Sequence, residues 1–111
     1  MDLITFLRAR LDEDEEVARA TRKNEQFVRG TDRWFASHSN AITSMAPHRA
    51  IAEVEAKRQI IEHNARLHQM ADPATHPDQE YVLAAGASDY VLRLLTLPYA
   101  DHIDYREEWR P

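Results

Sequence analysis

The residues best suited to metal binding in this 111-residue chain are its six histidines. His63 and His68 lie five positions apart, whereas two histidines on one helix share an ion when they lie four apart, as in HExxH. The other four fall in expected loops or near element ends, where histidine is usually solvated (His38, His48, His76, His102). The sequence therefore predicts neither a metal site nor a cofactor.

A second candidate chemistry is magnesium-dependent hydrolysis of a nucleotide by clustered carboxylates. One expected helix carries an acidic run in which the candidate residues are Asp12, Glu13 and Glu16. All-helical nucleotide pyrophosphohydrolases hold Mg²⁺ between carboxylates on facing helices. A matching pair on the neighbouring helix is required, and Glu53 and Glu55, two residues apart, point in different directions. The favoured interpretation is that residues 12–16 lie on the solvated side of the helix, which explains the acidic run without chemistry, so hydrolysis stays an alternative hypothesis.

A third candidate is nucleic-acid binding through Arg22, Lys23 and Trp34, since basic and aromatic side chains together can stack bases. Positive charge near the end of a helix also complements the helix dipole. The formal net charge of −5 argues against a phosphate-backbone binder. Nucleophilic catalysis has no support either, because the chain lacks cysteine, a glycine-flanked serine and a glycine-rich phosphate loop.

Apolar spacing divides the chain into three expected helices, at residues 2 to about 25, 47 to about 70, and about 78 to 97. Pro98 forbids continuation of the third. This third helix has the broadest apolar face, which predicts that it is the central helix. Gly86 in its middle costs about 1 kcal/mol relative to alanine. Close approach of another helix would compensate for this cost, and a break into two helices is the alternative.

Residues 26–45 break the helical pattern. Two short β-prone runs on either side of Gly30 favour a small hairpin, with an irregular aromatic loop as the alternative. The predicted fold is mainly α, with residues 1–111 as a single domain. It is an antiparallel three-helix bundle with the hairpin or aromatic loop between the first two helices and a short C-terminal helical turn, for which Asp104 and Glu107 suggest a capping box.

Aromatic side chains concentrate in the C-terminal segment from residue 99 to residue 109. Tyrosine and tryptophan dominate the energetics of protein interfaces, so Tyr99, His102, Tyr105 and Trp109 are candidate partner-binding residues. The favoured alternative is that the aromatic rings fold back and close the open end of the bundle.

The cellular compartment is predicted from three features that the sequence lacks: cysteine, a signal peptide and a membrane-spanning segment. The absence of cysteine fits a reducing environment. The first residues carry neither a basic segment nor an apolar segment of a signal peptide, and the most apolar stretch, Tyr90–Leu97, is too short to span a bilayer. The sequence predicts a cytoplasmic protein with no membrane association.

Three segments carry a family resemblance: residues 4–14 (ITFLRARLDED), 52–58 (AEVEAKR) and 92–111 (LRLLTLPYADHIDYREEWRP). They resemble a family of small proteins of unknown function from actinobacteria and their bacteriophages. The resemblance implies such an origin and brings no activity, cofactor or catalytic residue. Histidines that relatives carry before the middle helix are replaced here by residues such as Ala41 and Met45.

These observations predict a non-enzymatic, acidic protein–protein interaction module that binds an unidentified protein. A homodimer and a phage-encoded modulator of a host protein are the narrower interpretations. The magnesium-dependent hydrolase and the nucleic-acid-binding accessory protein are the alternatives.

Overall fold

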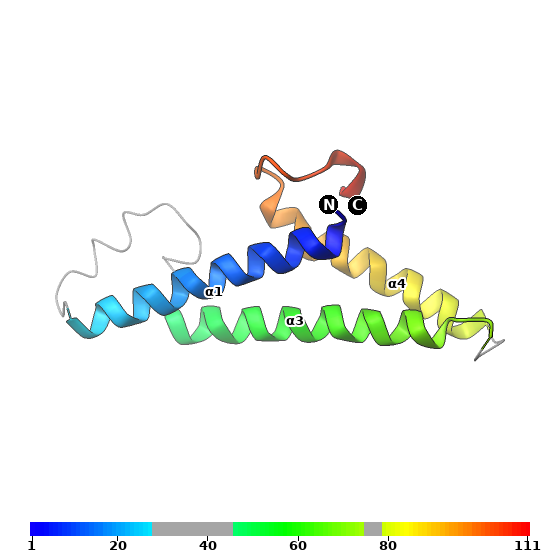
Figure 1. Cartoon of the computed structure of the whole chain (residues 1–111), viewed down its shortest axis with the longest axis horizontal. Helices are drawn as coiled ribbons and strands as arrows, with labels where there is room; N and C mark the ends of the chain where they lie inside the picture. The colour runs from blue at the N-terminus through cyan, green and yellow to red at the C-terminus, as the bar shows by residue number, and fades with distance from the viewer. Residues whose placement is uncertain (28–45, 75–78) are drawn as a thin grey trace. The chain divides into compact units, whose positions relative to one another are not determined.

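Three α-helices and two short 3₁₀ turns make up the computed structural model, which describes residues 1–27, 46–74 and 79–111 (Figure 1). The helices are α1 (Leu3–Phe27), α3 (Pro47–Met70) and α4 (Gln79–Thr96), and the turns are η1 (Leu97–Tyr99) and η2 (Glu107–Trp109). None of the described residues lies in a strand. The mainly helical class, the three helices and the C-terminal turn are confirmed.

Helix α1 begins where Asp2 caps it. The Asp2 carboxylate oxygen Oδ1 accepts a hydrogen bond of 2.7 Å from the Thr5 backbone N–H, and this bond lowers the pKa of Asp2. The helix continues to Phe27, so Gln26 and Phe27, expected in the first strand of a hairpin, are helical. Extension of an established helix by one residue adds a hydrogen bond, which outweighs the β propensity of so short a run. The rest of the predicted hairpin lies outside the described residues.

Helices α3 and α4 keep to their predicted limits. Pro47 occupies the first position of α3, where its missing N–H is no loss, and α4 ends just before Pro98. Gly86 does not break α4. An added Cβ at Gly86 would meet no atom of the described residues within 4 Å, so close packing against those residues does not explain this glycine.

The capping box expected at the C-terminal turn is wrong. The residue that precedes η2 at its N-cap is Arg106, whose side chain makes no capping hydrogen bond, and the Asp104 backbone N–H instead donates to His102 Nδ1 at 3.0 Å.

The structure divides into two compact units. Unit 1 combines Met1–Arg8 with Lys57–Pro111, and unit 2 comprises Ala9–Ala56. Both α1 and α3 run through the two units. The assignment of residues 1–111 to one domain stays a prediction.

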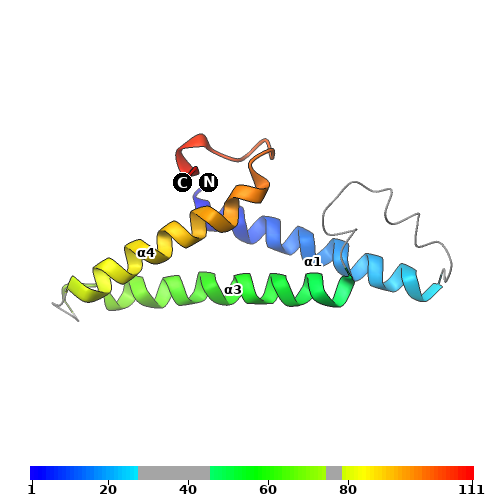
Figure 2. The same ribbon diagram turned by 180° about the vertical axis from the view of Figure 1, so that it is seen from behind.

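In unit 1, α4 runs back along the second half of α3, and the C-terminal segment returns to the first turn of α1 (Figures 1 and 2). The N- and C-termini therefore lie side by side. The buried apolar side chains of the unit come from all four of these segments: Phe6, Leu7, Ile61, Ala85, Leu92 and Trp109.

In unit 2, the later part of α1 lies beside the start of α3. Leu11, Ala18, Ala50 and Val54 are its buried apolar residues. Asp14 is buried as well, so the expectation that residues 12–16 all lie on the solvated side of the helix is wrong. Five consecutive helical residues turn through more than a full circle, so one of them must face inward.

Helix α4 does not occupy the central position predicted for it. Its buried residues are Ala85, Leu92 and Thr96, while most of its large apolar side chains are exposed. Thr96 satisfies its buried hydroxyl by donating to the Leu92 carbonyl oxygen at 2.6 Å. The face of α4 turned inward is therefore less apolar than the face turned outward.

Among the helices of residues 1–27, 46–74 and 79–111, none combines the length and the hydropathy required to cross a bilayer.

Candidate functional site

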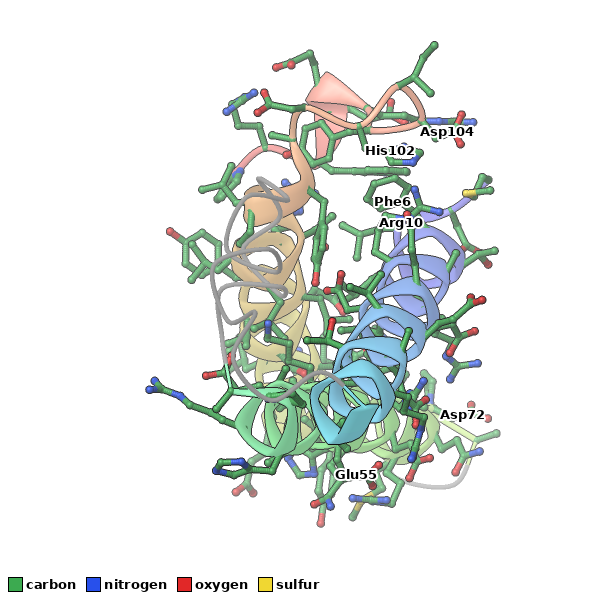
Figure 3. All side chains as sticks on the ribbon, turned by 90° about the vertical axis from the view of Figure 1, so that its left-hand side faces the viewer. Phe6, Arg10, Glu55, Asp72, His102 and Asp104 are labelled. Carbon is green, nitrogen blue, oxygen red and sulfur yellow. The ribbon has the colours of Figure 1, made fainter. Side chains whose placement is uncertain are left out.

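The C-terminal aromatic residues gather around Phe6 of α1. The Phe6 ring centroid lies 5.4 Å from that of His102, 6.1 Å from Tyr105 and 5.1 Å from Trp109. Tyr105 and Trp109 also meet edge to face at 5.6 Å. These separations and tilts are those that aromatic quadrupoles favour. Figure 3 shows His102 beside Phe6.

This aromatic cluster (Phe6, His102, Tyr105, Trp109) folds the C-terminal segment back onto the start of the chain, as the closure interpretation predicts. Trp109 is only 7% exposed, and Tyr105 and His102 are half-buried. Tyr99 lies in η1, also half-buried. Most of the surface that these rings could offer a partner is used inside unit 1, and direct partner binding by these residues stays a prediction.

A polar cluster that the sequence did not reveal joins α3 to α4. The amide Nδ2 of Asn64 donates to Asp89 Oδ1 at 2.8 Å and to Ser88 Oγ at 3.1 Å, and His68 Nε2 lies 2.8 Å from Asp89 Oδ1. Burial disfavours the charged form of Asp89, but the hydrogen bonds from His68 and Asn64 outweigh this effect and lower the pKa of the carboxyl group. An ionised carboxylate only accepts, so we assign the proton of His68 to Nε2.

This arrangement is structural rather than nucleophilic. Catalysis by serine requires the histidine to take the proton of the hydroxyl group. Here His68 faces Asp89, and the hydroxyl of Ser88 accepts from Asn64. The spacing of Asn64 and His68, four residues apart on one helix, was the available signal for a shared partner across the helix pair.

Next to the polar cluster lies a shallow hollow of about 210 Å³ in unit 1, lined by Leu3, Asp89, Leu92, Arg93 and Trp109. It is smaller than the 300–1,000 Å³ typical of small-molecule sites. Its two charged side chains carry opposite signs and lie one helical turn apart on α4. The hollow holds no set of groups that points to a reaction.

The most distinctive surface of the described residues is the outer face of α4. Six large apolar side chains are exposed there: Val82, Leu83, Tyr90, Val91, Leu94 and Leu97, the last at the start of η1. Leu83 is 74% exposed and Leu94 is 44% exposed. This is the broad apolar face from which a central position of the helix was expected, and most of its large side chains are exposed instead.

The carboxylates of the hydrolase hypothesis do not gather into a site. Asp12, Glu13 and Glu16 are exposed, and Glu13 pairs with Arg10, whose Nη2 lies 3.4 Å from Glu13 Oε2. Glu53 lies 3.4 Å from Arg49 Nε. In residues 1–27, 46–74 and 79–111, no three histidine or carboxylate side chains are arranged to hold a metal ion. The geometry therefore lends this hypothesis no support.

The nucleic-acid hypothesis depends on side chains outside the described part of the chain. The backbones of Arg22 and Lys23 belong to α1, but their side chains and the whole of Trp34 lie outside the described part of the chain.

The described residues define a helical protein in which the aromatic cluster joins the two termini and the outer face of α4 is apolar and exposed. The chain belongs to a family described as "Family of unknown function (DUF6221)", which it matches over residues 1–111. The predicted resemblance to a family of unknown function is thereby confirmed. No curated protein and no solved structure matches the chain.

Proposed function

We propose that this protein is a non-enzymatic protein–protein interaction module that binds its partner through the outer face of α4. The observation that carries the proposal is the exposure of the six large apolar side chains on that face. Monomeric proteins rarely expose a contiguous apolar patch of more than a few hundred Å², and larger patches mark interaction sites. A regular helix face is also a common docking element between proteins.

The remaining geometry fits this role. The polar cluster ties α4 to α3, and the aromatic cluster ties the C-terminal segment that follows α4 to the start of α1, so the outer face is presented on a helix that is held at its inner side and beyond its end. A preorganised face loses less conformational entropy on binding than a mobile one. The narrower interpretation of a phage-encoded modulator of a host protein rests on the family resemblance and stays a prediction.

Site-specific photo-crosslinking in cells of the source organism tests the proposal. A benzophenone amino acid replaces Leu83 or Leu94 in the full chain, and Ile103 in the control chain. Ile103 is an apolar residue that is 93% exposed and lies outside α4, so it matches the α4 positions in chemistry and accessibility.

We expect discrete protein adducts, including adducts with a second copy of the chain, from the two α4 positions and not from position 103. Equal adducts from all three positions, or none from α4, would refute the proposal.

A further inference from the structure

The outer face of α4 has the spacing of a two-helix seam. Leu83, Ala87, Tyr90, Leu94 and Leu97 recur at intervals of four, three, four and three residues, and all five are exposed. We call these five residues the α4 seam. The same interval pattern holds the apolar positions of a coiled coil on one side of the helix, where they interlock with a partner helix. The seam therefore fits another helix better than it fits a flat surface or a small molecule.

We infer that the occupant of the α4 seam is α4 of a second copy of this chain, paired antiparallel about a two-fold axis at Tyr90. This inference rests on the proposed function and names its partner. A two-fold dimer requires a surface that is complementary to itself. Three features of the seam meet that requirement.

The first feature is the size of the side chains. In an antiparallel pair, residues at equal distances from Tyr90 face each other, so Leu83 lies opposite Leu97 and Gly86 opposite Leu94. Ala87 lies opposite Arg93, whose exposed side chain can extend past the edge of the interface to solvent. Each leucine at position 94 then meets the glycine of the other copy, where the helices can approach closely. A parallel pair would set Leu94 against Leu94 and Ala87 against Ala87, which crowds one layer and leaves a gap in the next.

Gly86 adds independent support. Glycine in a helix interior lowers helix stability, and no described side chain occupies the space that a Cβ would fill. Packing among residues 1–27, 46–74 and 79–111 gives no reason for this glycine. A leucine from a second α4 would supply one.

The second feature is charge. The chain carries a formal net charge of −5, yet residues 81–97 contain one acid, Asp89, and one base, Arg93, and are neutral overall. Asp89 is turned toward α3 by its bonds to Asn64 and His68. A basic partner would require an acidic surface, whereas the seam is neutral. A second copy supplies a face that is equally neutral and apolar.

The third feature is area. The four large apolar side chains of the seam and Val82 and Val91 beside it each expose at least 36% of their surface. Together they offer roughly 500 Å² per chain and roughly 1,000 Å² in a pair, at the lower limit for specific interfaces. The dimer is therefore expected to be weak, with a Kd in the range of roughly 1–100 µM. Raising the salt concentration should strengthen it, because salt screens the repulsion between two acidic chains.

Sedimentation equilibrium of the purified full chain, from about 1 µM to about 1 mM, tests the dimer. We expect reversible dimerisation that tightens with salt. Leu94→Glu should raise the Kd at least tenfold, whereas Ile103→Glu, the same chemical change on an exposed residue outside the seam, should leave it within twofold. Circular dichroism of both variants verifies that the helices remain folded.

Disulfide trapping tests the direction of the pair, since the chain contains no cysteine. Tyr90→Cys should form a disulfide between the two cysteines at position 90 of a dimer. Leu83→Cys alone should not, but should form one when mixed with Leu97→Cys. Efficient self-trapping of Leu83→Cys would overturn the antiparallel arrangement.

The outcomes separate this inference from the proposed function. A chain that stays monomeric at 1 mM, or a dimer that Leu94→Glu does not weaken, overturns the inference. If the photo-crosslinks from positions 83 and 94 then identify a different protein, the proposed function stands with another partner. If those positions give no adduct, the proposed function fails as well. Dimerisation that weakens with salt would overturn the match of two like-charged copies.

Discussion

Replacing Trp109 with alanine should cost the protein a large part of its stability. The side chain is almost fully buried and contacts the rings of Phe6 and Tyr105. Burial of roughly 200 Å² of aromatic surface is worth about 5 kcal/mol at 25 cal/mol per Å². Residual compactness of the unfolded chain reduces this value to about 3–4 kcal/mol. The lost ring contacts contribute as well, and replacement of a buried tryptophan by alanine typically costs about 3–5 kcal/mol in total.

We therefore expect Trp109→Ala to lower the free energy of unfolding by about 3–5 kcal/mol, and the Tm by roughly 10–20 °C. Urea denaturation followed by circular dichroism at 222 nm measures the change without relying on the fluorescence of the deleted residue. Ile103→Ala is the matched control, because Ile103 lies six residues away on the same segment and is almost fully exposed. Its effect should stay within about 0.5 kcal/mol.

A double-mutant cycle isolates the contact between α1 and the C-terminal segment. Phe6→Ala and Trp109→Ala together should cost about 0.5–1.5 kcal/mol less than the sum of the two single changes, because the rings touch each other. If Trp109→Ala costs no more than Ile103→Ala, the aromatic cluster does not secure the segment and the reasoning fails.

Three further predictions concern α3 and α4. Asn64→Ala removes a fully buried donor to the Asp89 carboxylate and should lower the free energy of unfolding, measured by urea denaturation, by about 2–4 kcal/mol. His68→Ala affects a half-exposed pair and should lower it by less than about 1 kcal/mol. Equal losses in the two variants would contradict the assigned role of Asn64. Gly86→Ala should stabilise the monomer by about 0.5–1 kcal/mol in dilute thermal unfolding, since nothing described obstructs the added methyl group, and a loss would reveal an obstruction. The pKa of Asp89 is lower in the folded protein than in the unfolded chain. The carboxylate therefore stabilises the fold above the unfolded pKa, and this stabilisation is lost as the pH falls through the folded pKa. The free energy of unfolding should fall on acidification below about pH 4, and less steeply in Asp89→Asn; the same pH dependence in both proteins would refute this linkage.

Local sequence patterns predicted the elements of this protein well. The helix beginning at Pro47, the helix ending before Pro98, and Asp2 as a cap all depend on interactions within a few residues. Such interactions can be read directly from residue type and spacing. The hairpin's first residues were misjudged because β propensity is a weak preference that a neighbouring helix overrides.

The side of α4 that faces inward could not be decided from its sequence. Apolar residues surround much of the helix, so the periodicity indicates a helix without indicating which face is buried. The buried face proved to carry Ala85 and Thr96, two small residues that allow close approach, while the larger residues of the α4 seam stayed outside. The assumption that the most hydrophobic face of α4 is the buried face was therefore wrong.

The sequence by itself determined where α1 and α3 begin and where α4 ends, that no cysteine chemistry is available, and that aromatic residues are concentrated near the C-terminus. Tertiary structure alone decided that His102, Tyr105 and Trp109 close around Phe6, and that Asn64 and His68 share Asp89. The physical reason is separation along the chain. Contacts between residues twenty to a hundred positions apart depend on how all the intervening elements pack, and no spacing rule within one helix contains that information.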